Sequence, residues 1–329
     1  MLALSCVLLA LSGCHPAPPA AGTDSATETG DGGDGEDSAG ETGDDAEPLL
    51  TVGSTHNCLL QPDGTAECWG FAAAGQAVVP EGVAFTTLDA GLWHTCGLTG
   101  SGAVVCFGCV SGTNAGQCVV PEGKFRAVSA GVYHTCAIDN DGTLSCWGCG
   151  ERDAGQCDVP PGNYAVVDAG DGHTCAIPDD GTLGCWGCAG DGNQRDLGQC
   201  DAPTDTQFID VAIGSQSTCG LTTDGFVRCW GRDTFGEASP PEGSFLDVTA
   251  GNVHGCAIEP DHTLSCWGCG EGKLEGDPDL GQCEAPKAGS WSTVAGGVGH
   301  TCALDDDGGV TCWGCGTDWS FDGGQCEDR

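Results

Sequence analysis

Histidine and cysteine recur in this sequence at fixed spacing, and both residue types can do chemistry. A histidine stands two residues before a cysteine at six places: His56, His94, His134, His173, His254 and His300. A ring of imidazoles can bind a metal ion or act on a substrate as acid and base. A residue that is present in almost every copy of a repeat also fits a structural role. We expect the structural role, in which each histidine holds the backbone of its own copy in place.

The cysteines fall into recurring pairs. Seven pairs are ten residues apart: Cys58 and Cys68, Cys96 and Cys106, Cys136 and Cys146, Cys175 and Cys185, Cys219 and Cys229, Cys256 and Cys266, Cys302 and Cys312. Five further pairs lie just after them: Cys109 and Cys118, Cys149 and Cys157, Cys188 and Cys200, Cys269 and Cys283, Cys315 and Cys326. In two copies both members of this second pair are replaced together, by Phe71 and Ala77 and by Arg232 and Ala238. Joint presence and joint absence predict that the members of each pair form a disulfide with each other.

Zinc is the alternative use of these cysteines, because C-x-x-C occurs five times, for example at Cys106 and Cys109, and paired motifs of this kind bind zinc. The copies that lack the second pair would offer only two ligands each, whereas every pair is complete as a disulfide. Export of the protein would also favour oxidation. We therefore favour disulfides, each of which contributes about 2–3 kcal/mol to stability in the chain-entropy model.

The chain has too few large aliphatic residues for an ordinary apolar core, so the disulfides are important for its stability. Leu, Ile, Val and Phe are only 57 of 329 residues, and 48 Asp and Glu against 9 Lys and Arg give a formal net charge of −39. Such a composition normally predicts disorder, but 26 cysteines and 9 tryptophans are untypical of a disordered chain. Cross-links would stand in for the missing aliphatic core. The charge argues against nucleic acid as a partner, because a protein must neutralise phosphates with basic side chains.

Repeated short strands would bring the cysteines together. The stretch from Cys136 to Cys146 predicts a hairpin centred on Asp141, with Gly142 at the left-handed position of a three-residue loop and the two cysteines directly opposed. A β-rich segment such as 125–131 supplies a third strand before each hairpin. A unit of about 40 residues cannot cover its own faces, but a closed ring of them can. We predict an all-β, disulfide-rich, seven-bladed β-propeller over residues 49–329.

One aromatic residue per copy fits the same architecture. It follows the second cysteine of each ten-residue pair, and we expect it to pack between neighbouring blades. The residues at this position are Trp69, Phe107, Trp147, Trp186, Trp230, Trp267 and Trp313.

The first 48 residues predict a targeting signal followed by a tether. Residues 2–13 are an apolar run too short to span a bilayer, and it ends in Leu11-Ser12-Gly13-Cys14, which resembles the lipobox of bacterial lipoproteins. The resemblance implies a signal peptide over residues 1–13 and a lipid on Cys14; a plain secretory signal is the alternative. Residues 14–48 are acidic and almost free of large apolar side chains, which predicts a disordered tether. We expect an exported, lipid-anchored protein of the bacterial cell envelope, at the outer membrane or cell surface.

The repeated unit G-x-x-H-T-C-A-[IL], with an Asp-Gly turn, C-W-G and G-Q-C, resembles the regulator of chromosome condensation repeat. It is most similar to short bacterial forms such as beta-lactamase inhibitory protein two. The resemblance covers about residues 49–329 and implies a seven-bladed β-propeller, in agreement with the seven copies. The cysteine pairs depart from the eukaryotic repeats. The nucleotide-exchange activity of that family is not expected in an exported, acidic protein, and no catalytic residue of the family maps onto this chain.

The positions that differ between copies are candidates for binding. The residue before the histidine is aromatic in two neighbouring copies, as Trp93 and Tyr133, and the loop of the last cysteine pair contains Trp319 and Phe321. A constant scaffold with variable, covalently pinned loops is typical of a recognition surface, although loops without a function also drift. We predict that these four aromatic residues contribute to a binding site.

These observations favour a lipid-anchored binding module whose partner is a protein or glycan at the cell surface. The sequence has no G-x-S-x-G, H-E-x-x-H, P-loop or dinucleotide motif, so we predict no enzyme and no cofactor. The main alternative is an extracytoplasmic hydrolase or lyase that uses the histidine ring or bound calcium. Acidic turns such as 139–142 echo part of a calcium loop. A structural envelope component without a specific ligand is a third possibility.

Overall fold

A computed structural model of the chain describes residues 47–110, 114–150, 153–188, 196–270, 280–315, 324–327 and 329. The signal peptide and most of the tether, including Cys14, lie outside the described residues, as do Trp319 and Phe321. Within the described part of the chain, no helix is long and apolar enough to cross a membrane.

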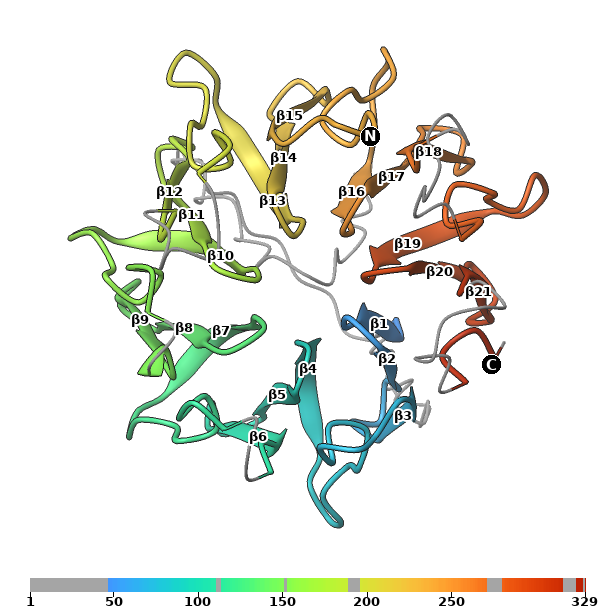
Figure 1. Cartoon of the computed structure of the whole chain (residues 1–329). Helices are drawn as coiled ribbons and strands as arrows, with labels where there is room; N and C mark the ends of the chain where they lie inside the picture. The colour runs from blue at the N-terminus through green and yellow to red at the C-terminus, as the bar shows by residue number, and fades with distance from the viewer. Residues whose placement is uncertain are drawn as a thin grey trace, which may run out of the picture.

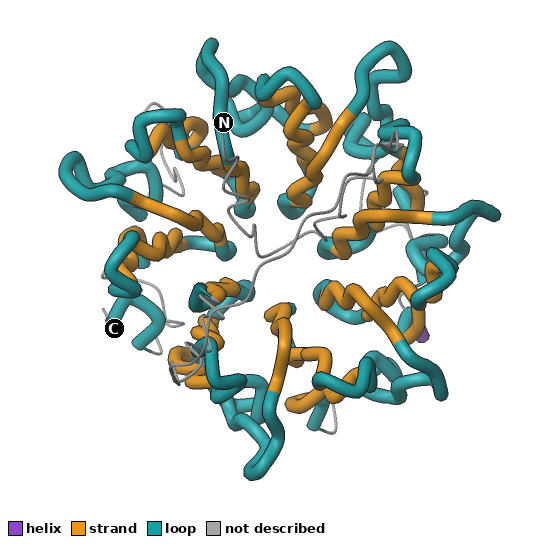
Figure 2. The backbone as a smooth tube through the Cα atoms, turned by 180° about the vertical axis from the view of Figure 1, so that it is seen from behind, coloured by secondary structure: helices purple, strands orange, loops and turns teal. Residues whose placement is uncertain are grey.

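The described strands form seven antiparallel sheets of three strands each, and each sheet is one blade (Figure 1). The blades surround a central axis, with loops at the periphery when the ring is seen from behind (Figure 2). In chain order the blades are β1 (Leu49–Val52), β2 (His56–Leu60), β3 (Ala66–Gly70); β4 (Phe85–Ala90), β5 (His94–Thr99), β6 (Val104–Gly108); β7 (Phe125–Ala130), β8 (Thr135–Asp139), β9 (Leu144–Trp147); β10 (Tyr164–Ala169), β11 (Thr174–Pro178), β12 (Gly184–Trp186); β13 (Phe208–Ile213), β14 (Ser217–Thr222), β15 (Val227–Gly231); β16 (Asp247–Ala250), β17 (His254–Ile258), β18 (Leu264–Gly268); β19 (Trp291–Gly296), β20 (His300–Asp305), β21 (Val310–Gly314). The predicted seven-bladed β-propeller is confirmed.

Each hairpin is closed by a disulfide at the predicted register. Cys136 lies opposite Cys146 in the β8–β9 ladder, and the Cα–Cα distance is 4.1 Å. Gly142 has φ 86° and His262, at the same position of blade 6, has φ 64°, which is the left-handed conformation that this loop requires. All twelve disulfides of the structure join the predicted partners.

The apolar core is divided into small clusters, each shared by two neighbouring blades. The cluster between blades 3 and 4 contains Cys136, Ile138 and Leu144 from one blade and Tyr164 and Val167 from the next. A hairpin cysteine with no exposed surface belongs to each of the seven clusters. The disulfides therefore lie inside the seams between blades, where they take the place of aliphatic side chains.

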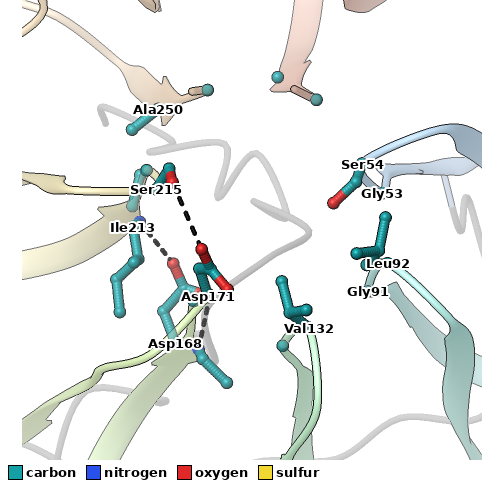
Figure 3. A pocket seen from close by; sticks show the side chains of 18 of the residues that line it. Gly53, Ser54, Gly91, Leu92, Val132, Asp168, Asp171, Ile213, Ser215 and Ala250 are labelled. Carbon is teal, nitrogen blue, oxygen red and sulfur yellow. Dashed lines mark hydrogen bonds between the residues drawn. The ribbon is translucent and has the colours of Figure 1, made fainter. Parts of the chain in front are cut away.

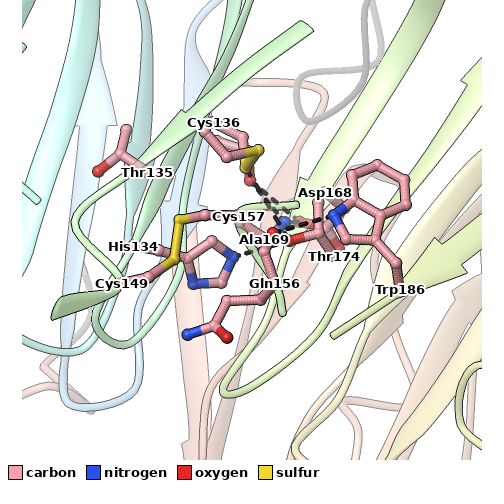
Figure 4. The surroundings of a disulfide bond; sticks show 12 residues. His134, Thr135, Cys136, Cys149, Gln156, Cys157, Asp168, Ala169, Thr174 and Trp186 are labelled. Atoms are coloured by element: carbon pink, nitrogen blue, oxygen red, sulfur yellow. Dashed lines mark hydrogen bonds between the residues drawn. A yellow bond between two sulfur atoms is a disulfide. The ribbon is translucent and has the colours of Figure 1, made fainter. Parts of the chain in front are cut away.

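The histidines link each blade to the next. His134 Nε2 lies 2.9 Å from Thr174 Oγ1 of the next blade, and that hydroxyl donates to the Gln156 carbonyl oxygen at 3.0 Å (Figure 4). The Trp186 indole N–H donates to the same carbonyl at 3.0 Å. Because the threonine hydroxyl has one proton and gives it to Gln156, His134 must donate from Nε2. We call this chain of bonds the His–Thr–Gln relay.

The relay repeats around the ring. Histidine and threonine are 2.7 to 3.0 Å apart at the corresponding seams, in the pairs His56 and Thr95, His94 and Thr135, His173 and Thr218, His254 and Thr301. Burial lowers the pKa of all six histidines from 6.5 to about 3 or 4, so they are neutral at physiological pH. These properties support the structural role expected for the histidines.

The ring closes between blades 7 and 1 without exchange of strands, because each sheet is formed by consecutive strands. His300 Nε2 donates to Asn57 Oδ1 at 2.7 Å, so Asn57 replaces the threonine of the relay. Asn57 in turn donates to the Gln325 carbonyl at 2.6 Å.

The seam between blades 5 and 6 lacks the relay. Ser217 replaces the histidine and Gly255 replaces the threonine, so both partners of one bond are lost together. A Cβ atom on Gly255 would lie 2.4 Å from Cζ2 of the buried Trp267. The indole therefore fills the space beside Gly255, and its N–H donates to the Glu237 carbonyl oxygen of blade 5 at 3.0 Å.

The relay predicts the effect of removing a single hydroxyl. Thr174→Val should lower the free energy of unfolding by ~1–3 kcal/mol, because the buried Nε2–H of His134 loses its acceptor. Thr174→Ser keeps the hydroxyl and should cost less than half as much. Denaturant unfolding of the two variants with intact disulfides measures the difference; equal losses would contradict the relay.

Candidate functional site

The described parts of the variable segments gather on one face of the propeller. We call the turn between the first and second strands of a blade the rim turn, and the segment after the third strand the pinned loop. Their backbones are joined by hydrogen bonds such as Cys109 N to Trp93 O at 3.1 Å and Cys269 N to Val253 O at 2.8 Å. The face that carries both is the rim face. The hairpin turns lie at the other end of the strands, on the hairpin face.

A central cavity of about 480 Å³ is lined by the rim turns and the first strands. Its mouth has two kinds of surface (Figure 3). Leu92 and Val132 contribute apolar side chains from blades 2 and 3, while Asp171 and Ser215 contribute polar ones from blades 4 and 5. Ser215 Oγ donates to Asp171 Oδ2 at 3.5 Å. The cavity can therefore take a group that has both an apolar part and a hydrogen-bond donor.

Carboxylates in the cavity wall tie the first strands together. Asp89 Oδ2 accepts the Ala130 N–H of the next blade at 2.7 Å, and Asp168 Oδ2 accepts the Ile213 N–H at 2.7 Å. Thr51, Ser129 and Thr249 accept an N–H from the next blade in the same way. Asp247 accepts the Val294 N–H at 3.1 Å, but it stands at a different position of its strand and is not among the residues that line the cavity.

The electrostatics of this wall are sensitive to pH near neutrality. Burial, and secondarily the charge of Asp89, raise the pKa of Asp168 to about 7. Burial and the charge of Asp210 raise the pKa of Asp247 to about 8. Burial also raises the pKa of Asp89. Asp168, which lines the cavity, therefore has a pKa close to neutral pH, whereas Asp247 is not among the lining residues.

The pinned loops are held in three ways. Five have a disulfide with Cα–Cα distances of 6.1 to 6.2 Å. In blade 5 the Arg232 guanidinium instead forms an ion pair with the buried Glu237 carboxylate, and it also donates to Asn252 of the next rim turn. In blade 1 the loop has neither bridge nor ion pair, and Phe71 N bonds to Thr55 O at 2.9 Å. In every blade with a glutamine before the second cysteine position, that glutamine is buried.

The structure places the predicted binding residues differently from one another. Tyr133 lines the cavity, but Trp93 is not among the lining residues, although the two occupy the same position of neighbouring rim turns. Both side chains are half-buried. Of these two aromatic residues the structure therefore places one, Tyr133, at the cavity, and their role in binding stays a prediction.

The acidic turns are occupied by local hydrogen bonds. Asp139 Oδ1 accepts from the N–H groups of Asp141 and Thr143 at 2.9 and 2.8 Å. Asp63 Oδ1 accepts from the hydroxyl of Thr65 at 2.6 Å. Among the described residues, no three His, Cys, Asp or Glu side chains are grouped in a way that could hold a metal ion.

Comparison with known proteins finds a family model that matches these repeats. The Regulator of chromosome condensation (RCC1) repeat model matches residues 125–156, 208–237 and 291–318. The resemblance seen in the sequence is thus confirmed, and the three matches fall in blades 3, 5 and 7 of the propeller. A search of curated proteins finds no match.

Solved structures share the fold of this chain. The CRINKLY WD40 ectodomain of the Arabidopsis thaliana receptor kinase ACR4 has a TM-score of 0.64 at 24% identity, covering 82% of this chain and 96% of that one. The ectodomain of the Physcomitrella patens receptor kinase CR4 has a TM-score of 0.65 at 22% identity, covering 82% and 73%. Prp20p from Saccharomyces cerevisiae has a TM-score of 0.62 at 17% identity, covering 78% and 83%. These identities establish the fold alone.

The raised pKa of Asp247 predicts a pH-dependent effect of Asp247→Asn. A carboxyl whose pKa is raised on folding stabilises the folded state fully below its unfolded pKa, near 4, and this contribution is lost as the pH rises to about 8. The amide does not titrate. The stability of the variant relative to the wild type should therefore increase from pH 4 to pH 8 and then level off, as measured by denaturant unfolding at each pH. A constant difference would show that Asp247 does not titrate in this range.

The pinned loops predict unequal effects of the two disulfides of blade 3. Cys149→Phe with Cys157→Ala reproduces the residues of blade 1 and should cost at most ~2–3 kcal/mol. Cys136→Ala with Cys146→Ala should cost about twice as much, because it also leaves a cavity in the seam. Thermal unfolding of the two variants compares them, and a larger loss for the loop pair would contradict this assignment.

Proposed function

We propose that this protein is a lipid-anchored binding module of the bacterial cell envelope and that its rim face binds a segment of a partner protein. The observation that carries the proposal is the division of the molecule into a repeated scaffold and one variable face. The relay, the hairpin disulfides and the seam clusters recur from blade to blade, whereas the rim turns and pinned loops differ, and the rim turns line a central cavity. Variable loops on a rigid scaffold are typical of binding sites.

The chemistry of the cavity favours a basic partner. The described residues that line it include no Lys or Arg. They do include four aspartates: Asp89, Asp168, Asp171 and Asp210. The whole chain has a formal net charge of −39, which steers positively charged partners toward it. A segment that offers an apolar side chain to Leu92 and a Lys or Arg to the acidic side would match both surfaces of the mouth.

A protein partner is favoured over a glycan by the relatives. The yeast propeller Prp20p is described by its binding to Gsp1p and histones, and another structure shows yeast RCC1 bound to Kap60. Those partners belong to those proteins. They support a protein as the class of ligand for this chain.

The point where the tether joins the propeller is compatible with a rim face that is exposed to partners. Pro48, just before β1, lies next to Gly308 in the β20–β21 hairpin turn, so the chain joins the propeller at its hairpin face. With a lipid on Cys14, a tether of about 34 residues reaches roughly 30–35 Å. The rim face would then point away from the membrane.

Affinity capture with a matched pair of variants tests the proposal. The delipidated protein, Trp93→Ala with Tyr133→Ala on the rim face, and Thr143→Ala on the hairpin face are each immobilised and exposed to an extracytoplasmic extract of the source cells. Quantitative mass spectrometry should find a protein that the wild type and Thr143→Ala retain and that the rim variant retains at least tenfold less. Equal retention by all three forms would contradict the proposal, and capture of a polysaccharide alone would replace the protein by a glycan.

A further inference from the structure

The pinned loop of blade 1 is held less firmly than those of the other blades. It runs from Phe71 to Val78, and among the described loops at this position it alone is closed by neither a disulfide nor an ion pair. Residues 68–80 contain no Asp, Glu, Lys or Arg. Ala72 and Ala73 are exposed, and Val78 is 64% exposed. The loop is therefore an uncharged, apolar segment of the rim face.

The side chain of Gln76 is buried against this loop with half of its amide unused. Gln76 has no exposed surface, and its Oε1 accepts the Ala74 N–H at 2.8 Å. Among the described glutamines at this position, Gln76 alone has a buried Nε2 without a hydrogen-bond partner. In blade 5 the corresponding Glu237 uses both oxygens, one for the Phe235 N–H and one for the Arg232 guanidinium. Blade 1 therefore keeps the N–H groups of one buried amide without an acceptor, which is unfavourable.

Two more unpartnered polar atoms border the same loop. Apart from histidine Nδ1 atoms, the buried side-chain N and O atoms of the described chain that have no partner are Gln76 Nε2, Thr55 Oγ1 and Trp93 Nε1. Phe71 N donates to Thr55 O at 2.9 Å, so the rim turn of blade 1 lies beside the start of the loop. Trp93 O and Gln76 Cα lie 2.6 and 3.2 Å from the position that a Cβ atom on Gly108 would take. The rim turn of blade 2 therefore lies beside the end of the loop.

These features lower the free energy needed to open the loop. A segment that is held by few contacts opens locally more easily than the rest of a fold. Displacing residues 72–74 from Gln76 would give its N–H groups access to an acceptor, so the buried amide does not oppose the opening. Folding does not require this arrangement, because the other six loops are closed by a disulfide or by an ion pair.

The unpartnered groups determine which ligand fits. The Gln76 amide nitrogen and the Trp93 indole nitrogen only donate, whereas the Thr55 hydroxyl can donate or accept. The main chain of an extended peptide offers carbonyl oxygens as acceptors and N–H groups that a hydroxyl can accept. Each sugar hydroxyl would bring a proton that needs an acceptor, and residues 68–80 contain no carboxylate. The exposed apolar side chains of the loop also fit uncharged side chains of a peptide.

We propose that the pinned loop of blade 1 is the part of the rim face that opens on binding and that it receives an extended, uncharged segment of the partner protein. A carbonyl oxygen of the segment accepts from the Gln76 amide, and the segment lies between the rim turns that carry Thr55 and Trp93. This inference rests on the proposed function, because it assigns a role to one part of the same rim face.

Hydrogen exchange at matched positions tests the opening of the loop. The amides of Val78, Val119 and Ser239 occupy the same position in blades 1, 2 and 5, and each donates to the carbonyl oxygen three residues earlier at 2.9 to 3.0 Å. In NMR exchange of the delipidated protein, Val78 should have a protection factor at least tenfold lower than the other two. Equal protection at the three positions would overturn the proposal.

Two pairs of substitutions close the loop with the means that other blades use. Phe71→Cys with Ala77→Cys adds the disulfide found at these positions in five blades, and Phe71→Arg with Gln76→Glu adds the ion pair of blade 5. The matched control, Arg232→Cys with Ala238→Cys, adds a disulfide to blade 5 instead. Phe71→Ala removes the ring but leaves the loop open. Peptide mapping by mass spectrometry verifies the added disulfides.

Fluorescence anisotropy with a defined peptide compares these variants. The labelled, amidated peptide Val-Ala-Phe-Ala-Val-Lys offers an uncharged stretch to the loop and a basic residue to the acidic side of the cavity mouth. Both closed-loop variants should bind it at least tenfold more weakly than the wild type. The blade 5 control and Phe71→Ala should bind it within threefold of the wild type.

The outcomes separate this inference from the proposed function. Binding by both closed-loop variants that equals that of the wild type would overturn the role of the loop. If Leu92→Ser with Val132→Ser then loses the peptide, the rim face remains the binding site. Absence of binding by the wild type, or binding that no rim substitution changes, would contradict both proposals. Circular dichroism of each variant verifies that it is folded.

Discussion

The fold depends on two kinds of link that replace a large apolar core. The first cross-links the strands within each blade, and the second joins each blade to the next. The hairpin disulfides do the first, and each lies in a seam cluster that contains few aliphatic side chains. The His–Thr–Gln relay does the second. Its bonds are buried and neutral, because burial holds the pKa of each histidine far below 6.5, so the relay does not need a charge in the interior.

Because the disulfides and the relay stabilise the scaffold, the sequence of the rim face can vary. The side chains of the rim turns do not take part in the seam clusters, so their sequence can change without loss of the fold. Blade 5 illustrates the tolerance of the scaffold. It lacks the relay histidine and the second disulfide, yet Arg232 and Glu237 hold its loop, and Trp267 fills the space beside Gly255.

The sequence predicts most of the fold because the cysteines mark every repeat. The offset of ten residues determines the hairpin register, and the joint loss at Phe71 and Ala77 indicates the second set of bridges. The relay was less visible, although the joint loss of histidine and threonine at Ser217 and Gly255 was a signal for it. The carboxylates of the cavity wall were missed because Asp89 and Asp168 stand at a position that other blades fill with different residue types, such as Thr51. Spacing along a strand also cannot tell that Tyr133 lines the cavity while Trp93 does not.

The central claim is that covalent links within single blades replace a continuous core. Peptide mapping of the mature, unreduced protein by mass spectrometry, with titration of free thiols, tests it most directly. The claim predicts that Cys58 to Cys326 contain no free thiol and that every linked pair joins cysteines of one blade, at the separations of 8 to 14 residues seen here. Peptides that link different blades, or a majority of free or metal-bound thiols, would contradict it.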